Sequence, residues 1–288
     1  MPEPAVAQSI ESLAPLREVI AQHGLSARKA LGQNFLLDLN LTRRIARAGG
    51  ALGGGTVIEV GPGPGGLTRA LLLEGARCLV AIEKDVRCVA ALGPLVEAAR
   101  GSLALKHADA LAVDLETLGP PPRRVVANLP YNLATALLLQ WLASIERRPG
   151  AVERLTLLFQ KEVAARLTAE PRSGAYGRLS VIAQWLCDVE RLFDIPPRAF
   201  TPPPKVISTL VALTPRARPL APASRSALEA VSAAAFGQRR KMLRQSLKSL
   251  GVPVAPLLAA ADAPETARAE ELSVEQFCAL ARALEKER

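Results

Sequence analysis

The sequence predicts an α/β fold, in which a doubly wound, mostly parallel sheet is followed by a small all-α domain. Three observations lead to this prediction. Short β-branched or apolar segments alternate with helical patterns between residues 56 and 159, a glycine-rich turn follows the first segment, and the chain beyond residue 213 shows helical periodicity alone. Alternating strands and helices are typical of a parallel sheet covered on both faces. With 288 residues, the chain is long enough for one full-sized core and a smaller appendage.

The elements begin with a polar, helix-prone leader, residues 1–25, which has no pattern that we can interpret. We expect it to be a flexible segment or a local extension. The strands that follow are predicted from short runs bounded by turns, and the helices from apolar periodicity. The predicted strands are 56–60, 78–82, 103–106, 124–127 and 155–159, with 206–213 closing the edge of the sheet, and the predicted helices are 67–73, 86–99 and 134–145.

A domain boundary is predicted at residue 213. The next residues, TPRARPLAPAS, carry three prolines and no apolar periodicity, which is typical of a linker. We therefore assign residues 1–213 to the sheet domain and residues 214–288 to the helical domain.

The charge of the chain indicates a polyanionic partner. Lys and Arg number 36 against 27 Asp and Glu, the net charge is +9 and the pI is about 9.9. Nucleic acid is the leading candidate for such a charge, and the alternative is a charge that serves only solubility. Eight basic side chains fall between residues 214 and 261, where Glu229 is the one acidic residue.

Several other classes of protein are disfavoured. The longest apolar runs fall well short of the roughly 20 residues that a membrane span needs. The first residues include Glu3 and Glu11 and lack the basic-then-apolar order of a secretory signal, so we expect a cytoplasmic protein. Four cysteines and two histidines have spacings that fit neither a disulfide framework nor a metal site.

A glycine-rich loop, residues 61–66 (GPGPGG), connects the first predicted strand to a helix. Glycine at these positions lets the backbone turn tightly and lets a ligand approach the main-chain amides. The loop fits both the G-x-G-x-x-G of dinucleotide-dependent enzymes and the E-x-G-x-G-x-G of S-adenosylmethionine-dependent methyltransferases. A turn without any ligand is the third interpretation.

Acidic residues stand at the ends of the next two strands. Glu83 ends the second strand, where a carboxylate can accept hydrogen bonds from both ribose hydroxyls of an adenosine. Asp109 follows the third strand and is placed to meet the amino group of a bound adenine. The alternative for each is a solvated loop residue, but the carboxyl ends of parallel strands meet at one edge of the sheet.

The tetrapeptide NLPY, residues 128–131, ends the fourth strand and favours methyl transfer, because hydride transfer has no use for it. The exocyclic amine of adenine is a poor nucleophile, since its lone pair is delocalised into the ring. If the Asn128 side-chain oxygen and the Leu129 carbonyl each accept one N–H bond, the lone pair can face an electrophile. Pro130 would hold that carbonyl outward, and the ring of Tyr131 would support an unstacked base. The alternative is an ordinary turn.

Nine sequence blocks in order resemble the bacterial small-subunit ribosomal RNA adenine dimethyltransferases over nearly the whole chain. The blocks are LGQNFL (31–36), IEVGPGPGGLT (58–68), Glu83, DAL (109–111), NLPYN (128–132), QKEVAARL (160–167), YGRLSV (176–181), PPRAFTPPPKV (196–206) and FGQRRKMLRQSL (236–247). The resemblance implies a seven-stranded, Rossmann-like class I methyltransferase sheet. It implies N6 dimethylation of two adjacent adenines in the 3′-terminal hairpin loop of 16S rRNA, in the pre-30S subunit, by a monomer that uses S-adenosyl-L-methionine.

The resemblance also implies roles for single residues. Asn34 and Leu36 would cover the cofactor from the N-terminal side, Gly61 would lie under its methionine portion, and Gly63 would also bind the cofactor. Glu83 would bind its ribose, Asp109 its adenine, and Asn128 would contact both cofactor and target. Phe200 would stack on the face of the target base opposite Tyr131, for which the alternative is a buried loop anchor.

The block that begins at Phe236 carries the predicted RNA contacts. Leu243, Leu247 and Leu250 have the spacing of a buried helix face, with basic residues on a second stripe that could lie along a phosphate backbone. We expect RNA binding by Arg239, Arg240, Lys241, Arg244 and Lys248. The alternative is a solvated helix face.

Three other functions remain open at this stage. The protein could be mainly a non-catalytic checkpoint of ribosome assembly. It could also be a 23S rRNA adenine dimethyltransferase, because the macrolide-resistance methyltransferases share the fold. A nicotinamide-dependent oxidoreductase is permitted by the glycine-rich loop, although it leaves residues 128–131 unexplained.

Overall fold

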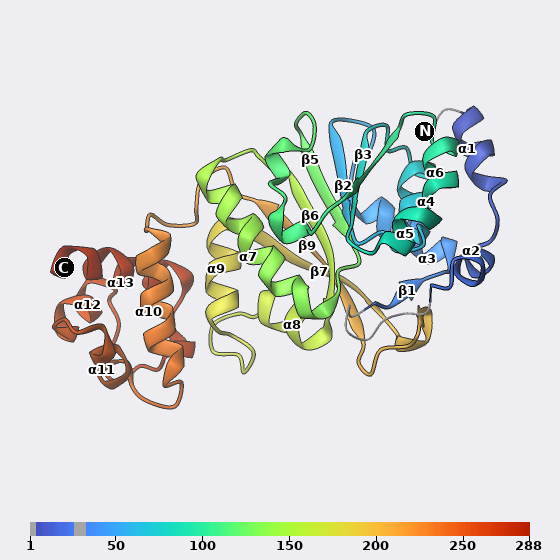
Figure 1. Cartoon of the computed structure of the whole chain (residues 1–288). Helices are drawn as coiled ribbons and strands as arrows, with labels where there is room; N and C mark the ends of the chain where they lie inside the picture. Colours follow the sequence, from blue (N-terminus) through green and yellow to red (C-terminus); the bar gives the residue numbers. More distant parts are fainter. Residues whose placement is uncertain (1–3, 26–32) are drawn as a thin grey trace. The chain divides into compact units, whose positions relative to one another are not determined.

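The structure is a computed structural model that describes residues 4–25 and 33–288 (Figure 1). Two compact units divide the chain, the first within residues 1–161 and 190–215 and the second within residues 162–189 and 216–288. The third junction between the units, at residues 215 and 216, lies close to the boundary at residue 213 that the linker composition predicts. Residues 162–189, which the sequence assigns to the sheet domain, group instead with the helical residues.

A seven-stranded sheet in the order β4-β3-β2-β5-β6-β9-β7 organises the first unit. Its first five strands in this order pair in parallel, and β9 pairs antiparallel with β6. The predicted α/β class with a doubly wound, mostly parallel sheet is therefore confirmed. The strands are β2 (Thr56–Val60), β3 (Leu79–Glu83), β4 (Leu103–His107), β5 (Arg123–Ala127), β6 (Arg154–Gln160), β7 (Cys187–Ile195) and β9 (Ser208–Pro215).

The central strands are apolar because both faces of the sheet are covered. All five residues of β2 are buried, as are the first six of β9. Placing residues 206–213 at the edge of the sheet was wrong, because β9 lies between β6 and β7. The edge strand β7 was not predicted, since exposed charged residues interrupt its sequence, CDVERLFDI.

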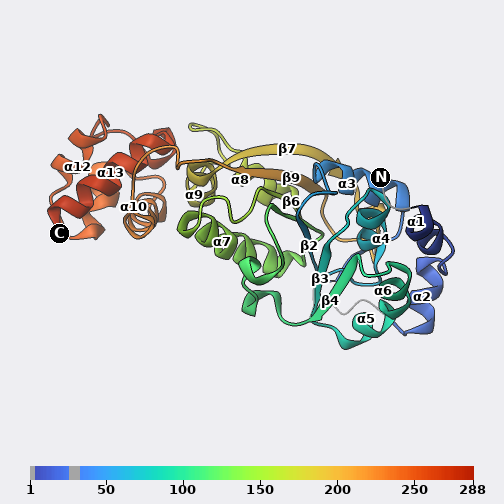
Figure 2. The ribbon, with the colours of Figure 1, turned by 90° about the horizontal axis from the view of Figure 1, so that it is seen from above.

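Helices lie on both faces of this sheet, with α4 and α6 on one side and α7 on the other (Figure 2). The single helix predicted at 86–99 is in fact two, because α6 begins anew at Gly93 with Pro94 in its first turn, where the missing N–H costs no helical hydrogen bond. The helices of this unit are α1 (Pro4–Glu11), α2 (Leu16–Gln22), α3 (Leu39–Ala48), α4 (Gly66–Leu73), α5 (Val86–Ala91), α6 (Gly93–Ala98) and α7 (Tyr131–Arg147), with short 3₁₀ turns at 110–112, 115–117 and 197–199.

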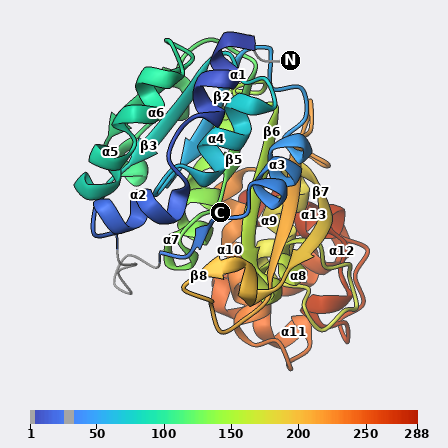
Figure 3. The same cartoon turned by 90° about the vertical axis from the view of Figure 1, so that its right-hand side faces the viewer.

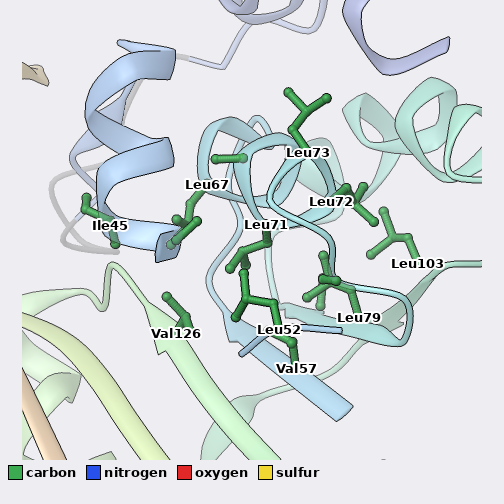
Figure 4. Packing of buried hydrophobic residues seen from close by; sticks show 14 of the residues in the cluster. Ile45, Leu52, Val57, Leu67, Leu71, Leu72, Leu73, Leu79, Leu103 and Val126 are labelled. Carbon is green, nitrogen blue, oxygen red and sulfur yellow. The ribbon is translucent and has the colours of Figure 1, made fainter. Parts of the chain in front are cut away.

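The leader is folded where the structure describes it, so of the two expected alternatives it is a local extension and not a flexible segment. Val6 and Ile10 of α1 are buried in the main hydrophobic cluster, and α1 packs against α4 and α6 (Figure 3). The same cluster joins side chains from α3, α4, β2, β3 and β5, among them Ile45, Leu71 and Val126 (Figure 4). This core fixes α4 against the strand from which the glycine-rich loop departs.

A two-stranded antiparallel ladder joins segments far apart in the sequence. In it, β1 (Phe35–Leu36) pairs with β8 (Phe200–Thr201), and Leu36 is the register partner of Phe200. The LGQNFL block, which contains β1, is described only in part, because Leu31 and Gly32 lie outside the described residues.

The second unit is helical. An aromatic cluster inside it consists of Tyr176, Phe236 and Phe277. The ring centroid of Phe236 is 5.9 Å from that of Tyr176 and 5.4 Å from that of Phe277. Its helices are α8 (Lys161–Leu167), α9 (Arg178–Leu186), α10 (Arg225–Gly237), α11 (Leu243–Ser246), α12 (Val254–Ala260) and α13 (Val274–Glu287), with 3₁₀ turns at 247–250 and 269–271. Among the described residues, no helix is both long enough and apolar enough to span a membrane.

The basic stripe predicted on one continuous helix is wrong. Helix α10 ends at Gly237, residues 238–242 are not helical, and α11 starts at Leu243. Met242 forms a β-bridge with Arg268, which draws the chain into an extended conformation there. Leu243 and Leu247 are buried as predicted, but Arg240 does not share a helix with Arg244.

Candidate active site

The candidate site lies where the strand order of the sheet reverses. From β2 the chain adds β3 and β4 on one side and then returns to add β5 and β6 on the other. At such a switch point the loops after the two central strands separate, and ligands of open α/β sheets bind in the crevice between them. A pocket at this place is lined by the glycine-rich loop after β2, the end of β3, the NLPY segment after β5, and residues 33–36.

The glycine-rich loop has a backbone that only glycine adopts easily. Gly61 and Gly63 both line the pocket, with φ of 71° and 56°. A Cβ on Gly63 would lie 2.9 Å from the Phe35 ring, so β1 can pack over the loop only because this residue has no side chain. Gly61, Gly63, Asn34 and Leu36, the residues expected around the cofactor on this side, therefore all lie in one pocket.

Glu83 is buried at the end of β3 and lines the same pocket. Its Oε1 accepts hydrogen bonds from the backbone N–H groups of Lys84 and Asp85, both at 2.8 Å, and its Oε2 accepts one from Gly63 at 3.1 Å. Burial raises the pKa of this carboxyl, while the three N–H groups oppose that shift. The carboxylate thus links two loops of the pocket and is held in a fixed orientation.

Asp109 is not among the residues that line the pocket. Its Oδ1 accepts a hydrogen bond from the Leu111 N–H, and its Oδ2 is 2.7 Å from Nζ of Lys84. This ion pair lowers the pKa of Asp109. Because Lys84 itself lines the pocket, Asp109 is connected to the site through one lysine.

Glu59 belongs to the site although the sequence analysis did not select it. It lies on β2, lines the pocket and is 1% exposed, and within residues 4–25 and 33–288 its Oε2 has no hydrogen-bond partner. Burial raises the pKa of Glu59 to about 8, and the nearby charge of Glu83 adds to the shift. The signal was present in the sequence, since Glu59 is the first residue of the E-x-G-x-G-x-G pattern.

The side chain of Asn128 is oriented by the main chain of the N-terminal segment. Its Nδ2 donates a hydrogen bond to the carbonyl of Asn34 at 2.9 Å. Among the described residues, none donates a hydrogen bond to Oδ1 of Asn128 or to the carbonyl oxygen of Leu129. Both residues line the pocket, so the NLPY segment brings two acceptors for a ligand amine to the site.

Pro130 and Tyr131 lead from these acceptors into helix α7. Pro130 precedes the first helical residue with a φ of −56°, and Tyr131 begins the helix. Tyr131 is half-buried and lines the pocket, and its hydroxyl forms a hydrogen bond with Oγ of Ser208 at 2.5 Å. All four residues of the predicted motif therefore lie together.

Phe200 does not lie in the pocket. Its side chain is 3% exposed and belongs to the main hydrophobic cluster, which matches the interpretation of a buried loop anchor. Pairing of β8 with β1 holds it there, opposite Leu36. In this conformation no face of the ring is available to a base.

The basic residues predicted to bind RNA lie in the second unit and differ in environment. Arg239 is half-buried, with Nε 2.8 Å from a carboxylate oxygen of Glu270 and an NH2 group 3.2 Å from the carbonyl of Ser173. The other four, Arg240, Lys241, Arg244 and Lys248, are exposed. The described residues contain no cluster of three or more His, Cys, Asp or Glu side chains that could hold a metal ion.

Known proteins identify the family. The model of the ribosomal RNA adenine dimethylase family matches residues 24–286. The chain belongs to the ribosomal RNA adenine dimethylase family. It is therefore a methyltransferase, as the NLPY segment indicates, and the nicotinamide-dependent alternative is excluded.

Curated relatives of this family cover the chain almost completely. Ribosomal RNA small subunit methyltransferase A of Paramagnetospirillum magneticum is 64% identical over 273 residues, covering 95% of each chain. The protein of the same name from Rhodospirillum rubrum is 61% identical over 275 residues, covering 96% of this chain and 94% of its own.

Solved structures show the same fold. The 23S rRNA methyltransferase ErmE aligns with a TM-score of 0.64 and 28% identity, covering 88% of this chain and 100% of its own. A dimethyladenosine transferase from Plasmodium falciparum aligns with a TM-score of 0.73 and 23% identity, covering 88% of this chain and 98% of its own.

Proposed function

We propose that the protein transfers methyl groups from S-adenosyl-L-methionine to N6 of two adjacent adenines in the 3′-terminal hairpin loop of 16S rRNA. The substrate would be the immature 30S subunit, and the protein would act as a monomer in the cytoplasm. The observation that carries the proposal is the orientation of Asn128, whose amide nitrogen is bound to Asn34 so that its oxygen remains available beside the Leu129 carbonyl.

The choice of the small-subunit substrate is supported by the relatives. Two proteins named for the small subunit are more than 60% identical to this chain, whereas the 23S rRNA methyltransferase is 28% identical. The 23S alternative is therefore less well supported than 16S rRNA.

The residues of the pocket fit the cofactor. When bound, S-adenosyl-L-methionine supplies an activated methyl group on a sulfonium. Glu83 would bind its ribose hydroxyls, since a buried carboxylate with a fixed orientation is a strong acceptor for such groups. Buried Glu59 has no hydrogen-bond partner for its Oε2 among the described residues, and the ammonium group of the amino-acid portion would favour loss of its proton and pair with the resulting carboxylate.

Other residues would enclose the cofactor. Asn34 and Leu36 would cover it from the N-terminal side, and the backbone of Gly61 and Gly63 would lie beneath it. Asp109 would contact the adenine after its ion pair with Lys84 breaks. This pair is exposed, and because exposed ion pairs contribute little stability, breaking it would cost little.

The NLPY segment would prepare the target amine. Hydrogen bonds from N6 to Oδ1 of Asn128 and to the carbonyl of Leu129 draw the nitrogen toward tetrahedral geometry and free its lone pair. Positioning then accounts for catalysis without a strong base, because the proton of the quaternised nitrogen is acidic enough to pass to water. Tyr131 would support the base after it leaves its stack, and a loop adenine is cheaper to extrude than a paired one.

The exposed basic residues of the second unit would bind rRNA through phosphates. Arg240, Lys241, Arg244 and Lys248 would add affinity without reading sequence. Arg239 would contribute mainly by holding its loop to Glu270.

Incubation of unmethylated pre-30S subunits with the protein and labelled cofactor tests the proposal. Mass mapping of 16S rRNA should then show two adjacent dimethyladenines in the 3′-terminal hairpin, and matched 50S precursors should remain unlabelled. Label that appears on 23S rRNA alone would overturn the assignment of the substrate.

A further inference from the structure

Ser208 lies at the same edge of the sheet as the candidate active site. It is the first residue of β9, which runs antiparallel to β6, and its register partner is Gln160, the last residue of β6. An antiparallel strand begins where its parallel neighbours end. The first side chain of β9 therefore lies next to the segments that follow the parallel strands.

The hydroxyl of Ser208 is joined to the phenol of Tyr131. The oxygen atoms are 2.5 Å apart, a short hydrogen bond between residues 77 positions apart in the sequence. Ser208 is 0% exposed and does not line the pocket, whereas Tyr131 does. Ser208 can therefore affect a ligand in the pocket through its contact with Tyr131.

We propose that Ser208 is a positioning residue, which holds the ring of Tyr131 in the orientation in which a flipped adenine stacks on it. This inference rests on the proposed function, because the proposed function is what makes the ring of Tyr131 a stacking surface for the target adenine. The hydrogen bond itself is independent of that function.

The geometry of α7 explains why such an anchor is needed. Tyr131 is the first residue of this helix, and its ring is only half-buried, so packing does not fix it on all sides. The torsion about the Cα–Cβ bond sets the direction in which the ring points, and a hydrogen bond to the hydroxyl at the far end of the ring holds that direction. A ring that is already oriented loses less entropy when a base binds to it.

The same bond decides which part of Tyr131 faces a substrate. Because the hydroxyl is bonded to a buried serine that does not line the pocket, the hydroxyl is occupied within the protein, and the ring of Tyr131 is the part left to contact a base. Burial raises the pKa of the phenol, so it stays protonated and can take part in this hydrogen bond at neutral pH. Tyr131 then acts as a stacking surface.

A double-mutant cycle tests the proposal. Ser208→Ala and Tyr131→Phe each remove the bond from one side and retain the aromatic ring. Each should lower kcat for methylation of pre-30S subunits roughly threefold to tenfold, and the double variant should lose no more than either single variant. The Kd of S-adenosyl-L-methionine should not change. Effects of the two changes that multiply would overturn the proposal.

Two further variants separate positioning from general damage to the core. Ser208→Thr keeps the hydroxyl on a residue that suits a strand, and it should restore most of the lost kcat. Ser144→Ala is the matched control. Ser144 is also a buried serine, it belongs to α7, the helix that begins with Tyr131, and it does not line the pocket. It should leave kcat unchanged. A loss of kcat for Ser144→Ala as large as that for Ser208→Ala would contradict the specific role.

A spectroscopic measurement keeps the test separate from the proposed function. The chain has two tyrosines, Tyr131 and Tyr176, so 3-fluorotyrosine labelling gives two fluorine signals, and Tyr131→Phe assigns them. Ser208→Ala should shift or broaden the signal of Tyr131 and leave that of Tyr176 unchanged. An unshifted signal would refute the anchor, whether or not the protein methylates 16S rRNA. A shifted signal in a protein without rRNA methylation would support the anchor and reject the proposed function.

Discussion

The side-chain amide of Asn128 donates its hydrogen bond to the main-chain carbonyl of Asn34, which precedes it by 94 residues. This contact determines which end of the amide faces the pocket. A carbonyl accepts only from the nitrogen of the amide, so the oxygen is left for a ligand. The N-terminal segment thus sets the chemical character of a residue at the end of β5.

Substitution of Asn128 should therefore reduce methyl transfer far more than cofactor binding. Asn128→Ala removes an acceptor of the target amine, and we expect a loss of roughly 100-fold or more in kcat on pre-30S subunits. Asn128→Asp keeps the size but places a carboxylate oxygen against the Asn34 carbonyl, and it should be similarly impaired. Calorimetry should show that both variants still bind S-adenosyl-L-methionine, with reduced affinity. Unchanged activity of Asn128→Ala would reject the proposed role of its side chain.

Glu83→Gln should weaken cofactor binding. The substitution removes the charge that three backbone N–H groups stabilise, and it turns an NH2 group toward one of them. We expect the Kd of S-adenosyl-L-methionine to rise roughly 10-fold to 100-fold in calorimetry. Glu74→Gln is the control, because Glu74 pairs with Arg43 outside the pocket. Equal affinity of Glu83→Gln and the unmodified protein would contradict a contact with the ribose.

Glu59 should make the stability of the protein depend on pH. Its pKa is about 8 in the folded protein and near 4.5 in the unfolded chain, so the folded state binds the additional proton between these values. Stability then falls as the pH rises from about 4.5 to about 8. The glutamine of Glu59→Gln is neutral at every pH, so the variant should not show this loss of stability. The unfolding free energy of the variant minus that of the unmodified protein should therefore be larger at pH 9 than at pH 5, by at most about 4 kcal/mol. Denaturant titrations at both pH values measure the change, and parallel pH profiles would show that Glu59 ionises normally.

The exposed basic residues of the second unit should affect binding of the particle and not folding. The double variant Arg244→Ala/Lys248→Ala should weaken binding to pre-30S subunits and lower the salt dependence by about one unit of slope for each lost phosphate contact. Its melting temperature should stay the same. Arg239→Ala should instead destabilise the fold modestly, by at most about 1 kcal/mol, because its pair with Glu270 is partly exposed. An unchanged salt slope in the double variant would place the RNA elsewhere.

The sequence was informative wherever local patterns decide the structure. Buried parallel strands are short apolar runs, and loops after them begin with recognisable residues, so β2 to β6 and the pocket residues at their ends were predicted. The edge strand β7 was not, because one side of it is exposed and its sequence lacks an apolar run. The break in the predicted helix between Gly237 and Leu243 was missed because the β-bridge between Met242 and Arg268 imposes it. Apolar periodicity within a segment gives no information about a partner that is distant in the sequence.

Pairings between distant segments account for most of what was missed in the site. The bonds from Asn128 to Asn34 and from Tyr131 to Ser208 join residues whose own neighbours give no indication of the contact. Phe200 shows the converse, since the family resemblance implied a stacking residue, whereas pairing with β1 holds it in the core as the alternative of a buried loop anchor predicts. Glu59 could have been predicted as a site residue, because it is the first residue of the glycine-rich pattern. Only its burial could not be inferred from the sequence.

The ladder between β1 and β8 connects a residue of the pocket to a residue of the buried core. Leu36 lines the pocket, and its register partner Phe200 is held in the core by the same two strands. If the proposed RNA substrate drew Phe200 outward, it would pull on the strand that contributes Leu36 to the pocket and would thereby change the site proposed for the cofactor. Thermodynamic reciprocity then requires each ligand to alter the affinity of the other by the same factor. The dissociation constant for the ribosomal particle should accordingly depend on whether S-adenosyl-L-methionine is present.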